Sequence, residues 1–100
     1  MGKQYEVVWT NLSQKQMRQL FDYISRDSIQ NASKVVRDIT ETVNKASDNP
    51  EMYPADKYKT ENDGSYRAFE QHRYRISYRF TGNIMRVLRV RHTSMKPEFY

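Results

Sequence analysis

The sequence of 100 residues contains no cysteine, only three glycines and three prolines, and no long hydrophobic run. Without cysteine the chain has no disulfide, no thiolate zinc site and no iron–sulfur cluster. Three glycines provide no glycine-rich phosphate-binding fingerprint, and no apolar stretch reaches the ~18 residues that a membrane span needs. The first residues lack the hydrophobic region of a signal peptide. We therefore expect one cytoplasmic domain over residues 1–100, with no membrane, metal or cofactor partner.

Positive charge is concentrated in the last third of the sequence. Residues 1–66 carry nine Lys or Arg and ten Asp or Glu, a net charge of −1, whereas residues 67–100 carry eight and two, a net charge of +6. This asymmetry favours an anionic partner such as nucleic acid, an acidic peptide or a membrane surface. The simpler alternative is a charged face that serves only solubility.

The first half of the sequence predicts a strand followed by two helices. Residues 4–9 alternate in hydrophobicity like a short strand. A capping-box match at Ser13–Gln16 opens an apolar stripe of helical spacing, which predicts a helix over residues 12–26. A second stripe from Ala32 to Ala46 predicts another helix, which ends near Ser47 because Asp48-Asn49-Pro50 is a stop signal. The short joint between the two predicts an antiparallel helical hairpin.

The second half predicts a long loop and then strands. Residues 48–65 show no period, so we expect a loop there. Three strand candidates follow, at residues 66–69, 72–80 and 84–91. A hairpin turn at Thr81-Gly82-Asn83 joins the last two, and residues 93–100 should be irregular. The predicted fold is therefore α+β, with the order β-α-α-β-β-β and the helical hairpin packed on one face of a small antiparallel sheet.

The sheet face turned away from the helices is predicted to be cationic and open to water. The arginines that alternation places there are Arg73, Arg75, Arg79, Arg89 and Arg91. Like charges on neighbouring strands repel at a cost of up to about 1 kcal/mol for a close pair, so a sheet that accepts them is suited to binding an anion. Arginine forks onto phosphates, and arginine and tyrosine stack on bases. Arg86 falls on the opposite side in this simple alternation.

Short blocks in a characteristic order accompany the predicted hairpin. They are Val8-Trp9-Thr10, Tyr66-Arg67-Ala68-Phe69-Glu70, Arg73-Tyr74-Arg75-Ile76-Ser77-Tyr78 and Arg89-Val90-Arg91-His92. In this order and spacing they resemble the RelE/ParE superfamily of bacterial type II toxin–antitoxin toxins over nearly the whole sequence. The resemblance implies a growth-inhibiting toxin that a cognate antitoxin neutralises. RelE-like toxins cleave mRNA on the ribosome, and ParE-like toxins poison DNA gyrase; the long hairpin and the following Tyr-Arg-x-x-Glu strand look more like the ParE branch.

The resemblance also implies roles for particular residues. RNA cleavage by its own 2′-hydroxyl needs a base, an acid and cations for the phosphorane. In a nuclease Arg75 would stabilise the phosphorane and His92 would be the acid or base, with Arg67 and Tyr100 as further candidates. Phe69 occupies the place of a strand lysine of RelE-like toxins. Whether the chain is an enzyme stays open, and a non-toxic RNA-binding module is a third alternative.

Antitoxin binding is expected to use the cationic residues. The set implied for it comprises Arg67, Arg73, Arg75, Arg79, Arg89, Arg91 and Lys96. An acidic and apolar C-terminal segment of the antitoxin would lie over the helix pair and the sheet and fold as it binds. Leu20 and Ile24 would supply apolar contacts if they are not fully internal.

Overall fold

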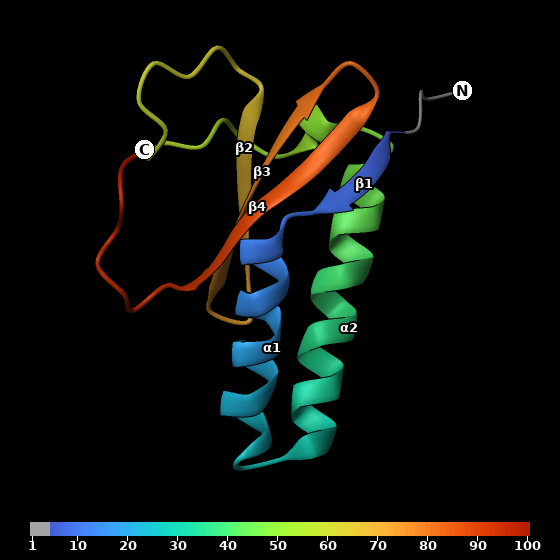
Figure 1. Ribbon diagram of the computed structural model, residues 1–100, viewed down its shortest axis with the longest axis vertical. Coiled ribbons are helices and arrows are strands. Elements are labelled where there is room, and N and C mark those ends of the chain that lie inside the picture. Colours follow the sequence, from blue (N-terminus) through green and yellow to red (C-terminus); the bar gives the residue numbers. More distant parts are fainter. Residues whose placement is uncertain (1–4) are drawn as a thin grey trace.

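The computed structural model describes residues 5–100, so the predicted strand residue Gln4 lies outside the described residues. Figure 1 shows the elements along the chain. They are β1 (Glu6–Trp9), α1 (Asn11–Ser25), α2 (Ile29–Ala46), the short 3-10 helix η1 (Pro50–Met52), β2 (Tyr66–Gln71), β3 (Tyr74–Thr81) and β4 (Ile84–His92). The predicted order β-α-α-β-β-β is confirmed, and the tail, by which we mean residues 93–100, is irregular as predicted.

Within the described residues the strands form one sheet in the order β1-β4-β3-β2. The neighbours β2 and β3, and likewise β3 and β4, are antiparallel, but β1 runs parallel to β4. The sheet is therefore mixed, and the prediction of a fully antiparallel sheet is wrong at β1. Alternation along a strand specifies which side chains share a face, whereas its direction is set by the crossover through the helical hairpin.

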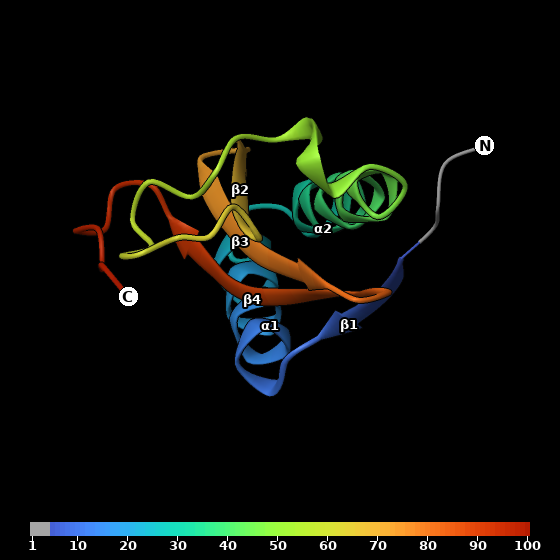
Figure 2. The same ribbon diagram turned by 90° about the horizontal axis from the view of Figure 1, so that it is seen from above.

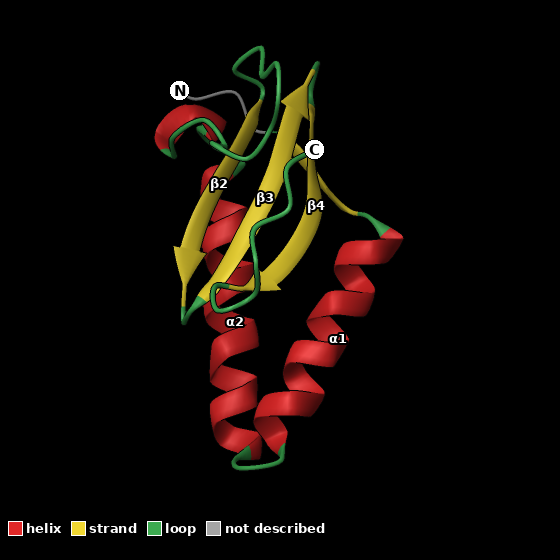
Figure 3. Ribbon diagram, turned by 90° about the vertical axis from the view of Figure 1, so that its left-hand side faces the viewer, coloured by secondary structure: helices red, strands yellow, loops and turns green. Residues whose placement is uncertain are grey.

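The helical hairpin packs on the sheet, and its two helices play different parts. Helix α2 lies across one face of the sheet (Figure 2). Its Val35, Ile39 and Val43 belong to the same buried core as Ile76 and Tyr78 of β3. Helix α1 lies beside β4 at the edge of the sheet (Figure 3). Its Gln16 Oε1 accepts a hydrogen bond from the Val90 backbone N–H at 2.7 Å, beyond the four-residue ladder that β1 forms with residues 84–87. Thus α1 completes the edge that the short β1 leaves uncovered.

Thr10 ties the start of α1 to the sheet. Its hydroxyl oxygen accepts a hydrogen bond from the Ser13 N–H at 3.1 Å, so Thr10 is the N-cap, three residues before the capping box that the sequence predicts. The same hydroxyl lies 3.0 Å from the Val87 carbonyl oxygen, to which it donates. One side chain therefore both begins the helix and fixes it to β4.

The other face of the sheet is covered by chain without regular secondary structure. The loop over residues 53–65 and the tail cross in front of β2, β3 and β4 (Figure 3). The loop is anchored on the outer edge of β2, where the Asp56 N–H donates to the Tyr66 carbonyl at 2.8 Å and Ala55 forms a bridge with Arg67. Among residues 5–100 no helix is long and apolar enough to cross a membrane.

Candidate functional site

The arginines of β3 and β4 lie on the sheet face opposite α2. Arg75 pairs with Arg91, Ser77 with Arg89, and Arg79 with Arg86 in the strand register. The sequence prediction that arginines of both strands share one face is confirmed for Arg75, Arg79, Arg89 and Arg91.

A β-bulge corrects the predicted position of Arg86. The register shifts between Ser77 and Tyr78, so that Leu88 of β4 is the extra residue. Because a bulge resets alternation, Val87 and Val90 both point into the core and are at most 4% exposed. Arg86 consequently lies on the same face as Arg89 rather than on the opposite one.

Two further predicted cationic residues lie elsewhere. Arg67 is the cross-strand partner of Tyr78 and so belongs to the α2 side of the sheet, where its guanidinium donates to the carbonyl oxygens of Gly64 at 2.8 Å and Tyr53 at 3.0 Å. Arg73 sits in the turn between β2 and β3 with φ 67° and is exposed. The prediction that Arg73 lies on the strand face is therefore wrong, because the chain turns before β3 begins at Tyr74.

Arg75 is bound by carboxylates of the chain itself. Its guanidinium lies 2.8 Å from Asp56 Oδ1 and 3.0 Å from Glu70 Oε2, and it stacks over the Tyr58 ring at 4.7 Å. The Asp56 side chain is only 1% exposed. Burial alone would raise the pKa of the Asp56 carboxyl, but hydrogen bonds from the Tyr100 hydroxyl and from Arg75 outweigh burial and hold this pKa below its usual range. The Nε of Arg75 is buried and has no hydrogen-bond partner among the described residues.

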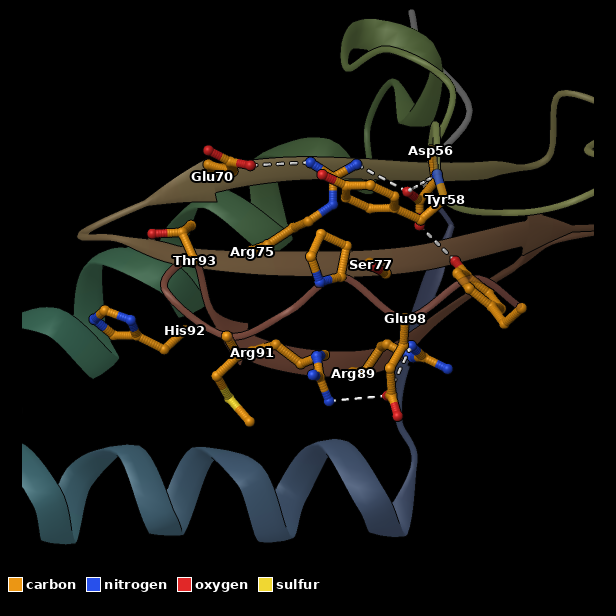
Figure 4. Close-up of a pocket in the computed structure, with 13 residues that line it drawn as sticks. Asp56, Tyr58, Glu70, Arg75, Ser77, Arg89, Arg91, His92, Thr93 and Glu98 are labelled. Atoms are coloured by element: carbon orange, nitrogen blue, oxygen red, sulfur yellow. Dashed lines mark hydrogen bonds and ion pairs between the residues drawn. The ribbon is translucent and has the colours of Figure 1, made fainter.

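The tail occupies the same face through Glu98. Its carboxylate lies 2.9 Å from Arg91 and 3.5 Å from Arg89, and Arg91 also donates to the Lys96 carbonyl oxygen at 3.1 Å. Figure 4 shows Glu98 between the two guanidinium groups. The Glu98 side chain is 59% exposed, so each pair contributes about 1 kcal/mol or less. The tail is held by several weak contacts rather than by one strong contact.

Tyr100 provides the other end of this attachment. Its ring lies 4.3 Å from the Arg89 guanidinium, and its hydroxyl donates to Asp56 Oδ2 at 2.6 Å. Its backbone N–H donates to the Tyr58 carbonyl at 3.0 Å, and its carbonyl oxygen accepts from the Thr60 N–H at 2.7 Å. Burial, followed by the hydrogen bond to Asp56, raises the pKa of Tyr100 above its usual value.

We call the surface beneath the tail the arginine groove. It consists of Arg75, Ser77, Arg89 and Arg91 from the sheet and Asp56 and Tyr58 from the loop. With the tail in place the remaining cavity is about 60 Å³, which holds only a few water molecules. The prediction of an open, water-facing cationic platform is therefore wrong. The groove is occupied because the loop and the tail supply the carboxylates that the crowded arginines need.

His92 lines one end of the same cavity, and its ring is held by its own turn. Its Nδ1 accepts a hydrogen bond from the Ser94 N–H at 3.1 Å and lies 2.7 Å from the Ser94 hydroxyl. Its ring packs edge-on against Tyr74, with the ring centres 5.0 Å apart.

The four predicted nuclease residues are only partly brought together. Arg75, His92 and Tyr100 line one cavity, where Arg75 and Tyr100 meet at Asp56 and His92 is bound to Ser94. Arg67 lies on the other face of the sheet. Lys96 is exposed and contributes its backbone carbonyl to Arg91. Leu20 is 3% exposed and is therefore not available to a partner, and Ile24 is half-buried against the core.

Sequence reasoning missed the acidic side of the groove. The sequence predicts Asp56 only as part of a long loop and Glu98 only as part of an irregular tail. One signal for Glu70 and Glu98 was available: they are the only two acidic residues beside the eight cationic residues of positions 67–100, so each is expected to pair with an arginine. Both of them contact arginines in the structure. No local sequence pattern indicates that the Asp56 side chain would form an ion pair with Arg75 of β3.

The helical hairpin on a four-stranded mixed sheet recurs in solved structures of toxin–antitoxin systems. A chain of the chromosomal ParDE toxin–antitoxin system from P. aeruginosa has the same fold, with a TM-score of 0.72, 19% identity, and coverage of 92% of this chain and 99% of that chain. A chain of the RelBE toxin–antitoxin complex from Mycobacterium tuberculosis superposes with a TM-score of 0.63, 16% identity, and coverage of 89% and 91% respectively. At these identities the similarity establishes the fold.

The sequence itself places the chain within the superfamily. The family described as the ParE toxin of the type II toxin–antitoxin system, parDE, matches residues 7–97. The chain belongs to this family, and it is a type II toxin–antitoxin toxin of the RelE/ParE superfamily. Comparison with curated proteins gives no match.

Proposed function

We propose that this toxin arrests growth by binding an essential protein in the cytoplasm, with DNA gyrase as the first candidate, and that a cognate antitoxin neutralises it. The match to the ParE toxin family over residues 7–97 carries the proposal, because the resemblance assigns gyrase to the ParE branch. The cationic residues of the sheet provide the charge that an acidic antitoxin segment would meet.

The positions of the nuclease candidates support a binding mechanism over a catalytic one. General acid–base catalysis requires that the acting groups reach one substrate bond together. Arg67 lies across the sheet from Arg75, and His92 Nδ1 accepts from Ser94. Phe69, at the position of the RelE-like strand lysine, is 6% exposed and packs in the core. The positions of these residues favour a toxin that acts by binding a partner protein.

An mRNA endoribonuclease is the second candidate. Its supporting observation is that Arg75 and Tyr100 share the Asp56 carboxylate, so that two of the four implied residues lie within one hydrogen-bonded group. His92 lines the same cavity, and its ring would have to leave Ser94 before such a site could act.

One induction experiment distinguishes these functions. The chain is expressed from a controlled promoter, and growth, plasmid supercoiling, chromosome breaks and mRNA 5′ ends are measured together. Blocked supercoiling or double-strand breaks with intact mRNA are expected. Codon-phased mRNA cuts that disappear in Arg75→Ala and His92→Ala would instead establish the nuclease. Normal growth combined with strongly salt-dependent RNA binding would indicate an RNA-binding module.

A control variant makes the growth readout specific to the folded toxin. Ile39 is fully buried in the centre of α2. Ile39→Asp places a charge in the core and should abolish both folding and toxicity. Growth arrest that persists in this variant would come from overexpression rather than from the toxin.

A further inference from the structure

A second cavity lies between α1 and the end of β4 (Figure 1), and we call it the α1–β4 cavity. It shares Arg91 and His92 with the cavity beneath the tail, but α1 forms its other wall. Its volume is about 280 Å³, close to the lower end of ligand-binding cavities, which begin at about 300 Å³. Its floor is apolar, since it includes the buried side chains of Leu20 and Val90. The cavity therefore has the size and the surface for a small molecule.

Tyr74 lines this cavity with a hydroxyl group that has no partner in the chain. The residue is 8% exposed, yet its hydroxyl makes no hydrogen bond within residues 5–100. Burial and the nearby Tyr23 phenol both raise the pKa of Tyr74, so the hydroxyl keeps its proton. A buried tyrosine hydroxyl normally has a hydrogen-bond partner. The partner of this hydroxyl is therefore a molecule in the cavity.

Other side chains around the cavity also keep hydrogen-bonding groups available. His92 uses Nδ1 on Ser94, and no contact within the described part of the chain uses its Nε2. The exposed Gln19 of α1 makes no hydrogen bond to any described residue. Hydroxyl and amide groups both donate and accept. The matching ligand therefore carries donors and acceptors together.

The charges around the cavity favour an uncharged ligand. Among the described residues that line it there is no Asp or Glu. Its one Arg, Arg91, has Nη1 on the Glu98 carboxylate and Nη2 on the Lys96 carbonyl oxygen. A phosphate or carboxylate in the cavity would find no unpaired cation, and an unpaired ion is costly to bury.

The edge of β4 beside the cavity favours a small molecule over a peptide strand. A peptide that adds to a sheet pairs with free backbone groups on an edge strand. Here the Val90 N–H already donates to Gln16 Oε1 at 2.7 Å. The groups that remain available are those of side chains, which do not repeat along a strand.

We propose that the α1–β4 cavity binds an uncharged purine, as the free base or the nucleoside, with its polar edge on Tyr74 and Gln19. The faces of a purine are flat and apolar, which suits the floor at Leu20 and Val90, and its edges carry both donors and acceptors. A glutamine amide pairs with adenine through N6 and N7, so adenosine is the first ligand to test. The bound purine joins α1 to the end of β4.

The test is a titration of the full chain with adenosine, followed by calorimetry and by thermal unfolding. At ten times its dissociation constant, adenosine is expected to raise the melting temperature by about 5 °C. Uridine has a smaller ring and should bind at least threefold more weakly, whereas ribose 5-phosphate has no base and should not bind. Absence of adenosine binding overturns the proposal, and so does binding of ribose 5-phosphate as tight as that of adenosine.

Matched variants locate the ligand. Tyr74→Phe keeps the ring and removes the hydroxyl, and it should weaken adenosine binding about fivefold. Gln19→Leu changes an exposed position of α1 and should have a similar effect, so it decides the outcome if Tyr74→Phe folds poorly. Tyr53→Phe removes a tyrosine hydroxyl that lies outside the cavity and should change binding less than twofold. Unchanged adenosine binding in both Tyr74→Phe and Gln19→Leu overturns the proposal.

Other occupants are outcomes of the same titration. An adenine octanucleotide that binds more than tenfold more tightly than adenosine, with an affinity that falls steeply with salt, would assign the cavity to a nucleic-acid strand. Self-association in analytical ultracentrifugation that adenosine suppresses would assign it to a second copy of the chain. Either result overturns the proposal.

Discussion

Asp56 and Arg75 form an ion pair, at 2.8 Å, between a loop and the middle strand of the arginine face. The two residues are 19 positions apart, and the carboxylate side chain is almost fully buried. The pair fixes the loop over the sheet, and the free Oδ2 of Asp56 then receives the Tyr100 hydroxyl. Asp56 is thus the point at which the loop, the sheet and the tail are joined.

We expect Asp56→Asn to destabilise the fold. The substitution removes the negative charge from Arg75, which keeps only the partly exposed Glu70 as a partner. The loss should be about 2–3 kcal/mol, because a largely buried cation is left incompletely paired. Urea unfolding followed by tyrosine fluorescence or circular dichroism measures it.

Glu70→Gln is the matched control for that measurement. The Glu70 side chain is 53% exposed, so removal of its charge should cost no more than about 1 kcal/mol. Similar losses in the free energy of unfolding for the two variants would show that Asp56 stabilises the fold no more than the exposed Glu70 does.

The Asp56 pair should also make stability depend on acid pH. Burial would raise the pKa of Asp56, but hydrogen bonds from Tyr100 and Arg75 lower it further than burial raises it. A carboxyl whose pKa is lower in the folded chain than in the unfolded chain adds stability above its unfolded pKa of about 4, and that stability is lost as the pH falls through the folded pKa. The free energy of unfolding should therefore fall more steeply between pH 5 and pH 2 in the wild type than in Asp56→Asn.

The comparison with the variant is needed because other carboxyls behave in the same direction. The pKa of Asp38 is lowered by hydrogen bonds from Lys34 and His72, and that of Asp63 by hydrogen bonds from Ser65. Both groups remain in Asp56→Asn, so the difference between the two curves reports Asp56. Parallel curves over this pH range would contradict the assignment.

Thr10 should contribute to stability through its hydroxyl rather than its methyl group. Thr10→Ala removes both the helix cap on Ser13 and the hydrogen bond to the Val87 carbonyl. We expect a loss of about 1–2 kcal/mol in thermal or urea unfolding. Thr10→Ser keeps the hydroxyl and should recover most of that loss. If the serine variant is as unstable as the alanine variant, the hydrogen bonds are not the cause.

His92 tests the catalytic alternative. Because its Nδ1 accepts from Ser94 and its ring packs on Tyr74, His92→Ala should lower stability by about 1 kcal/mol and leave growth arrest within about twofold of the wild type. Ser94→Ala removes the hydroxyl partner but keeps the imidazole, and serves as the matched control. Loss of growth arrest in a folded His92→Ala chain, with normal arrest in Ser94→Ala, would contradict a binding mechanism.

Much of the fold could be predicted because its signals are local. The apolar stripe of α2 has the period of a helix, and its positions from Ala32 to Ala46 are buried except for Val36, which is partly buried. Alternation in β3 likewise placed Ile76 and Tyr78 in the core. The direction of β1 and the position of Arg86 could not be predicted in this way, because the first depends on a crossover and the second on a bulge opposite Ser77.

The sequence by itself determined the elements, their order, the faces of the helices and the gathering of arginines in the last third of the chain. It did so because hydrophobic periodicity and charge are properties of neighbouring residues. Only the tertiary structure decided that Arg67 and Arg75 lie on opposite faces and that Asp56 and Glu98 close over the arginines. Those contacts join residues that are far apart in the sequence. The carboxylates offset the repulsion between arginines on neighbouring strands, and no local sequence pattern shows which carboxylates will do so.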